Sequence, residues 1–105
     1  MMSKYGATKT VIDGIRFDSK KEAIRYGQLK LLQRAGHISG LELQKTYRLE
    51  INGHLICKYI ADFEYLERGV PVVEDVKSAF TRRLPVYSIK RKLMAAIHGI
   101  TICET

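Results

Sequence analysis

The sequence reads YIADFEYL at residues 59–66 and VPVVEDVK at residues 70–77, with the short polar segment Glu67-Arg68-Gly69 between them. Aromatic and apolar side chains recur at every second position of the first stretch, and the second stretch is rich in β-branched residues. Both patterns are typical of β-strands. Because a short polar connection that contains glycine favours a hairpin turn, we predict that the two strands pair with each other.

The alternation of side chains along these strands assigns their polar residues to faces. Asp62 lies on one face of the first strand, while Asp75 and Lys77 project from one face of the second. Glu74 points to the face opposite Asp75, and Glu64 lies beyond the first aspartate, toward the turn. We expect these two glutamates to be ordinary surface charges.

Asp62, Asp75 and Lys77 together suit the hydrolysis of a phosphodiester. That reaction needs neutralisation of the charge that builds on the phosphoryl oxygens and a water molecule activated near neutral pH. Mg²⁺ held by carboxylates supplies both, and a nearby lysine can orient or deprotonate the water. The alternative is that the three residues are cross-strand charge pairs on a solvated face, each pair contributing about 0.2–1 kcal/mol without any chemistry.

The N-terminal third of the chain is predicted to contain a hairpin and a helix. Residues 1–8 form a polar, flexible tail, and residues 10–17 read as two short extended runs about the turn Asp13-Gly14. The segment Ser19-Lys20-Lys21-Glu22 has capping-box spacing, so we expect a helix over residues 20–35. The predicted buried stripe of this helix consists of Ile24, Gly27, Leu31 and Ala35.

The middle of the chain continues with extended segments. Residues 41–44 and 46–51 are one bent strand or two pieces, and they end at the hairpin signal Asn52-Gly53. A strand over residues 55–66 pairs back against them, and the third strand covers residues 70–78.

A basic loop at residues 79–84 precedes a second helix and a last strand. Pro85 is suited to open the helix, Gly99 is suited to cap its end, and residues 100–103 read as the strand. The order is therefore αβββαβ after a small hairpin, and the 105 residues form a single α/β domain. The predicted buried stripe of the second helix consists of Val86, Ile89, Leu93 and Ile97.

Three segments of the chain resemble a known pattern: FDSKKEA at residues 17–23, YIADF at residues 59–63 and VEDVK at residues 73–77. They are similar to the PD-(D/E)XK nuclease superfamily, and more closely to small phage and prophage proteins within it. The resemblance covers residues 9–104. The chain departs from the pattern at Ala61, where the superfamily name has proline, and at Asp75, where glutamate is commoner.

The resemblance implies a metal-dependent DNA endonuclease with a restriction-endonuclease-like core, in which helices flank a mixed central sheet. Asp62, Asp75 and the Val76 carbonyl are the implied ligands of Mg²⁺, with Mn²⁺ also accepted. Lys77 then positions the attacking water. In similar nucleases, a glutamate of the first helix contributes to the metal site, which implies that role for Glu22. Alternatively, Glu22 is a glutamate only because it belongs to the capping box.

The charge of the chain agrees with a DNA partner. Eighteen Lys and Arg against eleven Asp and Glu give a net charge of +7, which favours polyphosphate ligands. Gln44 either lies beside the site and contacts DNA or is an ordinary edge-strand glutamine. We expect five further basic residues to contact DNA phosphates, namely Arg82, Arg83, Lys90, Arg91 and Lys92. The alternative is that they only form a solvated surface.

The substrate that the resemblance implies is branched DNA, because the similar phage proteins include structure-specific endonucleases. A Holliday-junction-resolvase-like enzyme of phage recombination or replication must make two matched nicks, so we expect a homodimer. Two other interpretations remain, namely a catalytically inactive DNA-binding module and an accessory subunit of a phage DNA-processing complex.

The cysteines and the apolar segments bear on the location of the protein. Cys57 and Cys103 have neither C-x-x-C spacing nor a histidine cluster, so we expect reduced thiols and no zinc site. The chain begins without an apolar signal core, and no apolar stretch is long enough to cross a membrane. We therefore expect a protein of the bacterial cytoplasm, which the resemblance implies is encoded by a phage or prophage.

Overall fold

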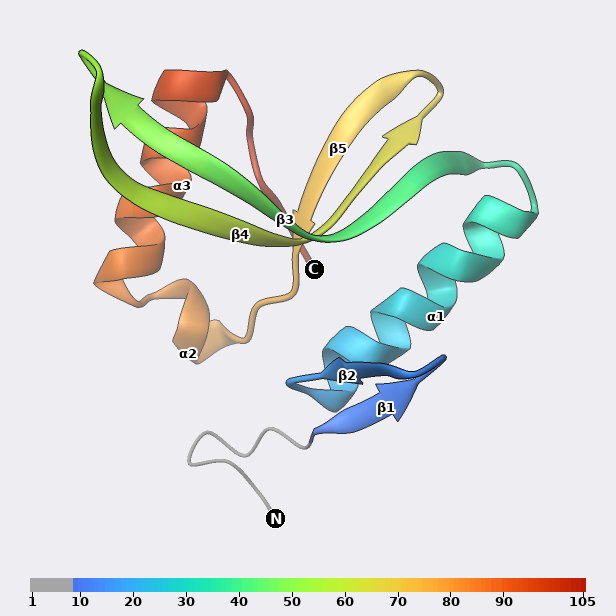
Figure 1. Cartoon of the computed structure of the whole chain (residues 1–105). Coiled ribbons are helices and arrows are strands. Elements are labelled where there is room, and N and C mark those ends of the chain that lie inside the picture. The colour runs from blue at the N-terminus through green and yellow to red at the C-terminus, as the bar shows by residue number, and fades with distance from the viewer. Residues whose placement is uncertain (1–8) are drawn as a thin grey trace.

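A long antiparallel hairpin, formed by β3 (Ile38–Ile51) and β4 (His54–Glu67), crosses the whole molecule (Figure 1). This computed structural model describes residues 9–105, so the predicted tail at residues 1–8 lies outside the described residues. Strand β4 also pairs with antiparallel β5 (Val70–Asp75), and β5 pairs in parallel with β6 (Cys103–Glu104). The sheet is therefore mixed, with the order β3-β4-β5-β6, as predicted for an α/β protein.

Three helices and a small separate hairpin complete the fold. The hairpin pairs β1 (Thr10–Ile12) with β2 (Ile15–Phe17). The helices are α1 (Lys20–Arg34), the short α2 (Ala79–Arg82) and α3 (Pro85–His98). Within residues 9–105, none of the helices combines the length and the apolar character needed to cross a membrane.

The predicted elements occur in the predicted order, with one additional helix and with several different boundaries. The loop predicted at residues 79–84 contains α2, because Ser78 and Thr81 form a reciprocal capping box at its start. Strand β5 ends at Asp75 rather than at residue 78. The last strand covers only Cys103–Glu104, because only these residues pair with β5.

The turns predicted from glycine-containing dipeptides are confirmed. Asp13-Gly14, Asn52-Gly53 and Arg68-Gly69 each have positive φ at both residues, as a type I′ hairpin turn requires. The bent strand predicted over residues 41–51 is one continuous strand, β3. Its residue Gln44 has φ of +54°, in the left-handed region that residues other than glycine rarely adopt.

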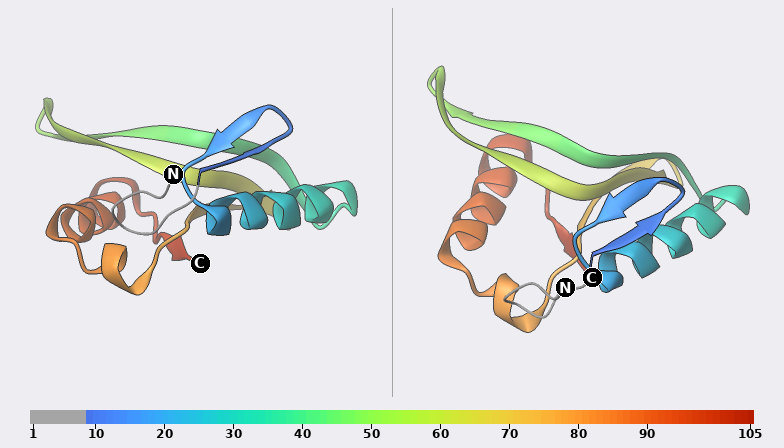
Figure 2. Two further views of the ribbon diagram at one scale, coloured as in Figure 1. Left: turned by 90° about the horizontal axis from the view of Figure 1, so that it is seen from below. Right: turned by 60° about the horizontal axis from the view of Figure 1, so that its bottom comes forward.

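The two long helices pack against opposite ends of the hairpin and form two apolar cores (Figure 2). The first core joins α1 to Phe63 and Tyr65 of β4. The second joins α3 to Tyr59 and Ala61 of the same strand. Strand β5 runs between the helices, since Val73 belongs to the second core while the next residue faces α1.

The buried face of α1 differs from the predicted stripe. Ile24 and Leu31 are 53% and 63% exposed, and Ala35 is also exposed, while Gly27 is only partly buried. The buried residues instead include Glu22, a polar residue that hides the true stripe from an apolar pattern. The residues that α1 buries are Glu22, Ala23, Tyr26 and Leu29.

The predicted stripe of α3 is half right. Leu93 and Ile97 pack against the second core, but Val86 and Ile89 are exposed. The buried positions of the helix are Tyr87 and Met94. Pro85 and Gly99 begin and cap the helix as predicted, and Gly99 has φ of +67°.

The prediction that Glu64 and Glu74 are ordinary surface charges is wrong. Glu74 is fully buried, because α1 covers its face of β5 and supplies Arg25, which forms a two-point ion pair with its carboxylate. The Tyr65 hydroxyl donates a third hydrogen bond to Glu74 at 2.7 Å. Glu64 is partly buried and accepts a hydrogen bond from the Tyr47 hydroxyl.

Two leucines of α1 test which face of this helix is buried. We expect Leu29→Ala to lower the free energy of unfolding by about 2–5 kcal/mol, because its side chain is fully buried in the first core. Leu31→Ala, on the exposed face, should change it by less than about 0.5 kcal/mol. Urea denaturation of both variants measures the difference, and equal losses would contradict the packing of α1 described here.

Candidate functional site

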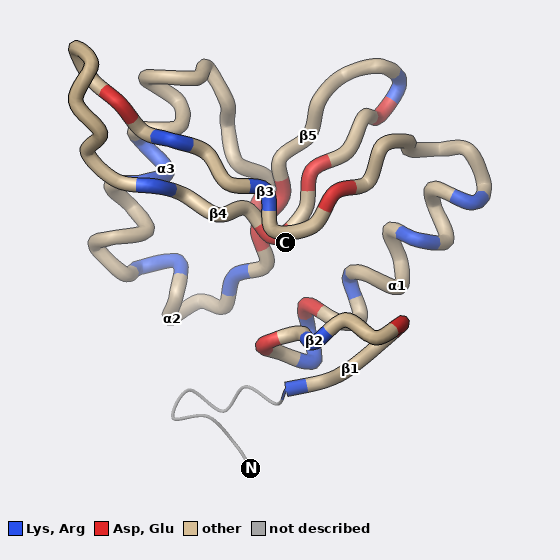
Figure 3. Tube along the Cα trace, in the orientation of Figure 1, with Lys and Arg blue, Asp and Glu red and all other residues tan. Residues whose placement is uncertain are grey.

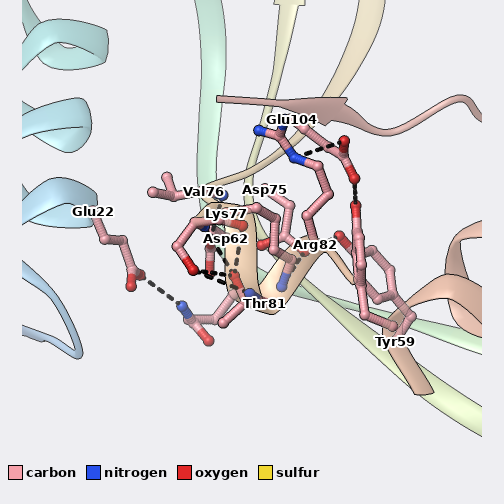
Figure 4. Close-up of polar contacts among 12 residues, drawn as sticks. Glu22, Tyr59, Asp62, Asp75, Val76, Lys77, Thr81, Arg82 and Glu104 are labelled. Carbon is pink, nitrogen blue, oxygen red and sulfur yellow. Dashed lines mark hydrogen bonds and ion pairs between the residues drawn. The ribbon is translucent and has the colours of Figure 1, made fainter. Parts of the chain in front are cut away.

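The register of β4 against β5 brings two aspartates together. Phe63 pairs with Glu74, so the next position places Asp62 opposite Asp75, where β5 ends. The backbone N–H of Val76 donates to Asp62 Oδ2 at 2.8 Å, which holds the first carboxylate at the end of the second strand. Figure 4 shows both aspartates beside Lys77 at this point.

Asp75 is held by two further groups. Its side chain is almost completely buried, and the Tyr59 hydroxyl donates to its Oδ2 at 2.6 Å. The Lys77 ammonium lies 3.3 Å from the same oxygen. Asp75 therefore has a fixed orientation, with a cation beside it.

Lys77 is positioned in turn by residues near α3. Its ammonium lies 4.3 Å from the centre of the Tyr87 ring, in a cation–π arrangement. The Tyr87 hydroxyl donates to Glu104, which also pairs with Arg82 at 3.3 Å. The Lys77 side chain is 20% exposed, so this cation is largely shielded yet still reachable from solvent.

Burial and the neighbouring Asp75 disfavour the charged form of Asp62. Burial raises the pKa of Asp62 well above its usual range, and hydrogen bonding to and repulsion from Asp75 raise it further. The Val76 N–H partly opposes this increase in pKa by stabilising the charged carboxylate. A cation bound between the two carboxylates would reverse the repulsion.

Glu22 approaches the site from α1 and is also buried. Burial and then the charges of Asp18 and Asp75 raise its pKa. Ser19 Oγ accepts the backbone N–H of Glu22 at 3.1 Å, but the Glu22 carboxylate is hydrogen-bonded by Gln44 Nε2 at 3.4 Å. The glutamate thus contacts Gln44 of the sheet, and a backbone hydrogen bond from Asp18 partly opposes the increase in its pKa.

Gln44 lies on the edge strand β3 and beside the site, while its contact with DNA stays a prediction. It falls between the pairs Leu43–Phe63 and Lys45–Ala61, opposite Asp62. Its positive φ bends the strand there and brings its amide to Glu22. Strained backbone of this kind persists where the surrounding structure holds it, and it is common at functional sites.

The donor atoms at this site fit a divalent cation of the Mg²⁺ type. Within residues 9–105, no group of three or more His, Cys, Asp or Glu side chains is gathered closely enough to hold a metal. Mg²⁺ is commonly bound by one or two carboxylates, with water and substrate phosphates as the remaining ligands. The adjacent, mutually repelling pair Asp62 and Asp75 meets that requirement.

Two open cavities are lined by residues that contact the aspartates, one by Tyr59 and Lys77 and the other by Val76. One, of about 340 Å³, lies on the α3 side and includes Lys58, Lys77 and Lys90 in its wall. The other, of about 300 Å³, lies on the α1 side and includes Lys21 and Arg25. On the α1 side, Arg25 is paired with the buried Glu74, and the Lys21 ammonium donates to the Lys77 carbonyl at 2.8 Å.

The structure separates the basic residues predicted to contact DNA. Lys90 lines a cavity next to Lys77, while Arg82 is paired with Glu104. Figure 3 shows basic segments on α2, α3 and the hairpin, and acidic segments where the strands meet. The remaining predicted contacts are exposed and touch neither cavity: Arg83, Arg91 and Lys92.

Sequence reasoning missed several residues around the site. Tyr59, Tyr87 and Glu104 orient Asp75 and Lys77, and Lys58 lines the larger cavity. A tyrosine in an alternating strand reads as a core residue, so the sequence carries no signal for its hydroxyl contact. Lys58 could have been noticed only as a cation on the strand that carries the first aspartate.

Comparison with known proteins gives one match. A protein-family model, described as "Protein of unknown function (DUF1064)", matches residues 2–99. No curated protein and no solved structure matches the chain.

Asp62 itself tests the electrostatics of the site. Because its pKa is raised in the folded protein, the stability that depends on Asp62 falls as pH rises from the ordinary aspartate range to the raised value. At neutral pH without metal, Asp62→Asn should therefore raise the free energy of unfolding by about 1 kcal/mol, or Tm by about 4–8 °C. Thermal unfolding measures this, with exposed Glu67→Gln as the control; a lower Tm in Asp62→Asn would contradict the assigned repulsion.

Proposed function

The chain belongs to the DUF1064 family, whose model spans residues 2–99, and we propose that it is a metal-dependent endonuclease that hydrolyses phosphodiester bonds in DNA. The observation that carries the proposal is the pair of buried Asp75 and partly buried Asp62, with Lys77 against it. Two carboxylates held together at a cost in stability, beside a shielded ammonium, suit metal-assisted hydrolysis better than they suit structural support.

The residues that would hold Mg²⁺ or Mn²⁺ are Asp62, Asp75 and the Val76 carbonyl, with Glu22 completing the site. The bound metal supplies charge neutralisation at the phosphoryl oxygens and a more acidic water. Lys77 positions the attacking water, and its contact with Asp75 keeps it close to the reacting phosphate. Tyr59 keeps the Asp75 carboxylate in one orientation through its hydroxyl.

The architecture supports a nuclease of the restriction-endonuclease-like type. The order of elements and the mixed sheet agree with the core that the PD-(D/E)XK resemblance implies. Asp75 lies at the end of β5 and Asp62 on the adjacent β4, and Figure 4 shows them together with Lys77 and Tyr59. Fold alone carries no activity, so the proposal rests on the site and not on this agreement.

Branched DNA is the proposed substrate, in a phage or prophage pathway of recombination or replication in the bacterial cytoplasm. The net charge of +7 and the three lysines of the cavity on the α3 side support contacts with the DNA backbone. Two matched nicks in a four-way junction require two sites, so the proposed active form is a homodimer. Sedimentation of the protein with and without junction DNA measures the number of chains.

A second candidate function is a DNA-binding module without catalysis, or an accessory subunit of a DNA-processing complex. The observation that favours it is the lack, within the described part of the chain, of a preformed cluster of three metal-binding side chains. Metal-dependent cleavage of DNA distinguishes the two candidate functions, because only an endonuclease shows it.

The test compares the protein with Asp75→Asn on labelled four-way junction, flap, linear duplex and single-stranded DNA, each with Mg²⁺, Mn²⁺ or EDTA. We expect metal-dependent nicks near the branch, and a loss of about 100-fold or more in rate in the variant, because one metal ligand is removed. Asparagine still accepts the Tyr59 hydrogen bond, so folding and DNA binding should persist.

Exposed Glu67→Gln, at the far end of β4, is the control and should cleave like the wild type. Full activity of Asp75→Asn would overturn the assignment of the site. Tight DNA binding by the wild type without cleavage under any metal would establish the binding module instead.

A further inference from the structure

We propose that the cavity on the α3 side of the aspartates binds one nucleotide whose base is outside the duplex stack. The inference rests on the proposed function, because it names the form of DNA that the same site takes. It predicts that the enzyme selects DNA with an unpaired nucleotide next to the cleaved phosphate.

The cavity is contiguous with the proposed catalytic residues. Lys77 and Tyr59 belong to its wall, and both contact Asp75. Its other walls come from β4 and from the start of α3, about 25 residues later in the chain. A nucleotide in this cavity would therefore have its phosphate beside Lys77 and the aspartates.

The charges around the cavity fit a phosphate group. Three ammonium groups line it, from Lys58, Lys77 and Lys90, and no carboxylate is among the lining residues in the described part of the chain. An acidic protein segment would match these charges as well. It would not explain why the cavity opens beside two carboxylates that suit phosphodiester hydrolysis.

The apolar walls of the cavity point to a base or sugar in addition to a phosphate. Val86 is 64% exposed, Ile60 is 53% exposed, and Leu84 is also exposed. Contacts with the backbone of a paired duplex need only polar and cationic groups. Exposed apolar side chains beside a cationic site gain from contact with an unstacked base, whose faces are apolar.

The size of the cavity limits what it can hold. Its volume of about 340 Å³ is at the small end of the range for ligand pockets, which suits one nucleotide rather than a longer single strand. The smaller cavity lies on the α1 side, where Arg25 is paired with Glu74 and Lys21 donates to the Lys77 carbonyl.

Two exposed residues of α3 provide a matched test. Val86→Glu adds a negative charge to the cavity wall, in the first turn of the helix, where an acidic residue is favourable for folding. Ile89→Glu adds the same charge at a similarly exposed position outside the cavity wall. Binding is measured in EDTA to a paired duplex and to the same duplex with one unpaired 2-aminopurine nucleotide.

We expect the wild type to bind the duplex with the unpaired nucleotide about tenfold more tightly than the paired duplex. Val86→Glu should lose this preference and the accompanying change in 2-aminopurine emission, while Ile89→Glu should keep both. Equal affinity of the wild type for the two DNAs, or equal behaviour of the two variants, would overturn the nucleotide-binding cavity.

Cleavage of the same DNAs with Mg²⁺ separates this inference from the proposed function. If the protein keeps the binding preference but cleaves neither DNA, the proposed endonuclease activity is wrong and the cavity is supported as a nucleotide-binding site. Cleavage of both DNAs at equal rates by the wild type and both variants would support the endonuclease and overturn the cavity.

Discussion

The register between β4 and β5 is the constraint on which the rest of the site depends. It places Asp62 opposite Asp75, and the Val76 N–H then fixes the Asp62 carboxylate. The same register places Phe63 in the core, so a slip of one residue would expose this ring and separate the acids. The burial of the core therefore enforces the geometry of the site.

The long hairpin connects that register to both helices. Its bend at Gln44 lies opposite Asp62, between the half of β4 that packs on α1 and the half that packs on α3. Glu22 reaches the site from one helix, and Tyr87 supports Lys77 from the other. The polar side chains of the site therefore lie between the two apolar cores.

The site is costly to fold, and its surroundings offset that cost. Burial and mutual repulsion disfavour the charged forms of Asp62 and Glu22, as the raised pKa values of both residues express. On the next residue of β5, the buried Glu74 is satisfied by Arg25 and Tyr65, which tie the strand to α1. A neighbouring acid is therefore fully paired, while the two aspartates stay available to a cation.

The sequence by itself determined the strands, the two long helices and the turns, though not α2, because alternation, capping residues and positive-φ dipeptides act over a few residues. It also identified Asp62, Asp75 and Lys77 as a group, since strand parity and the short turn between the strands already bring them together. Only the tertiary structure decided the burial of Glu74 and the contact of Tyr59 with Asp75. Both depend on which face of a strand a distant helix covers and on how far the hairpin bends, and such long-range packing leaves no local pattern in the chain.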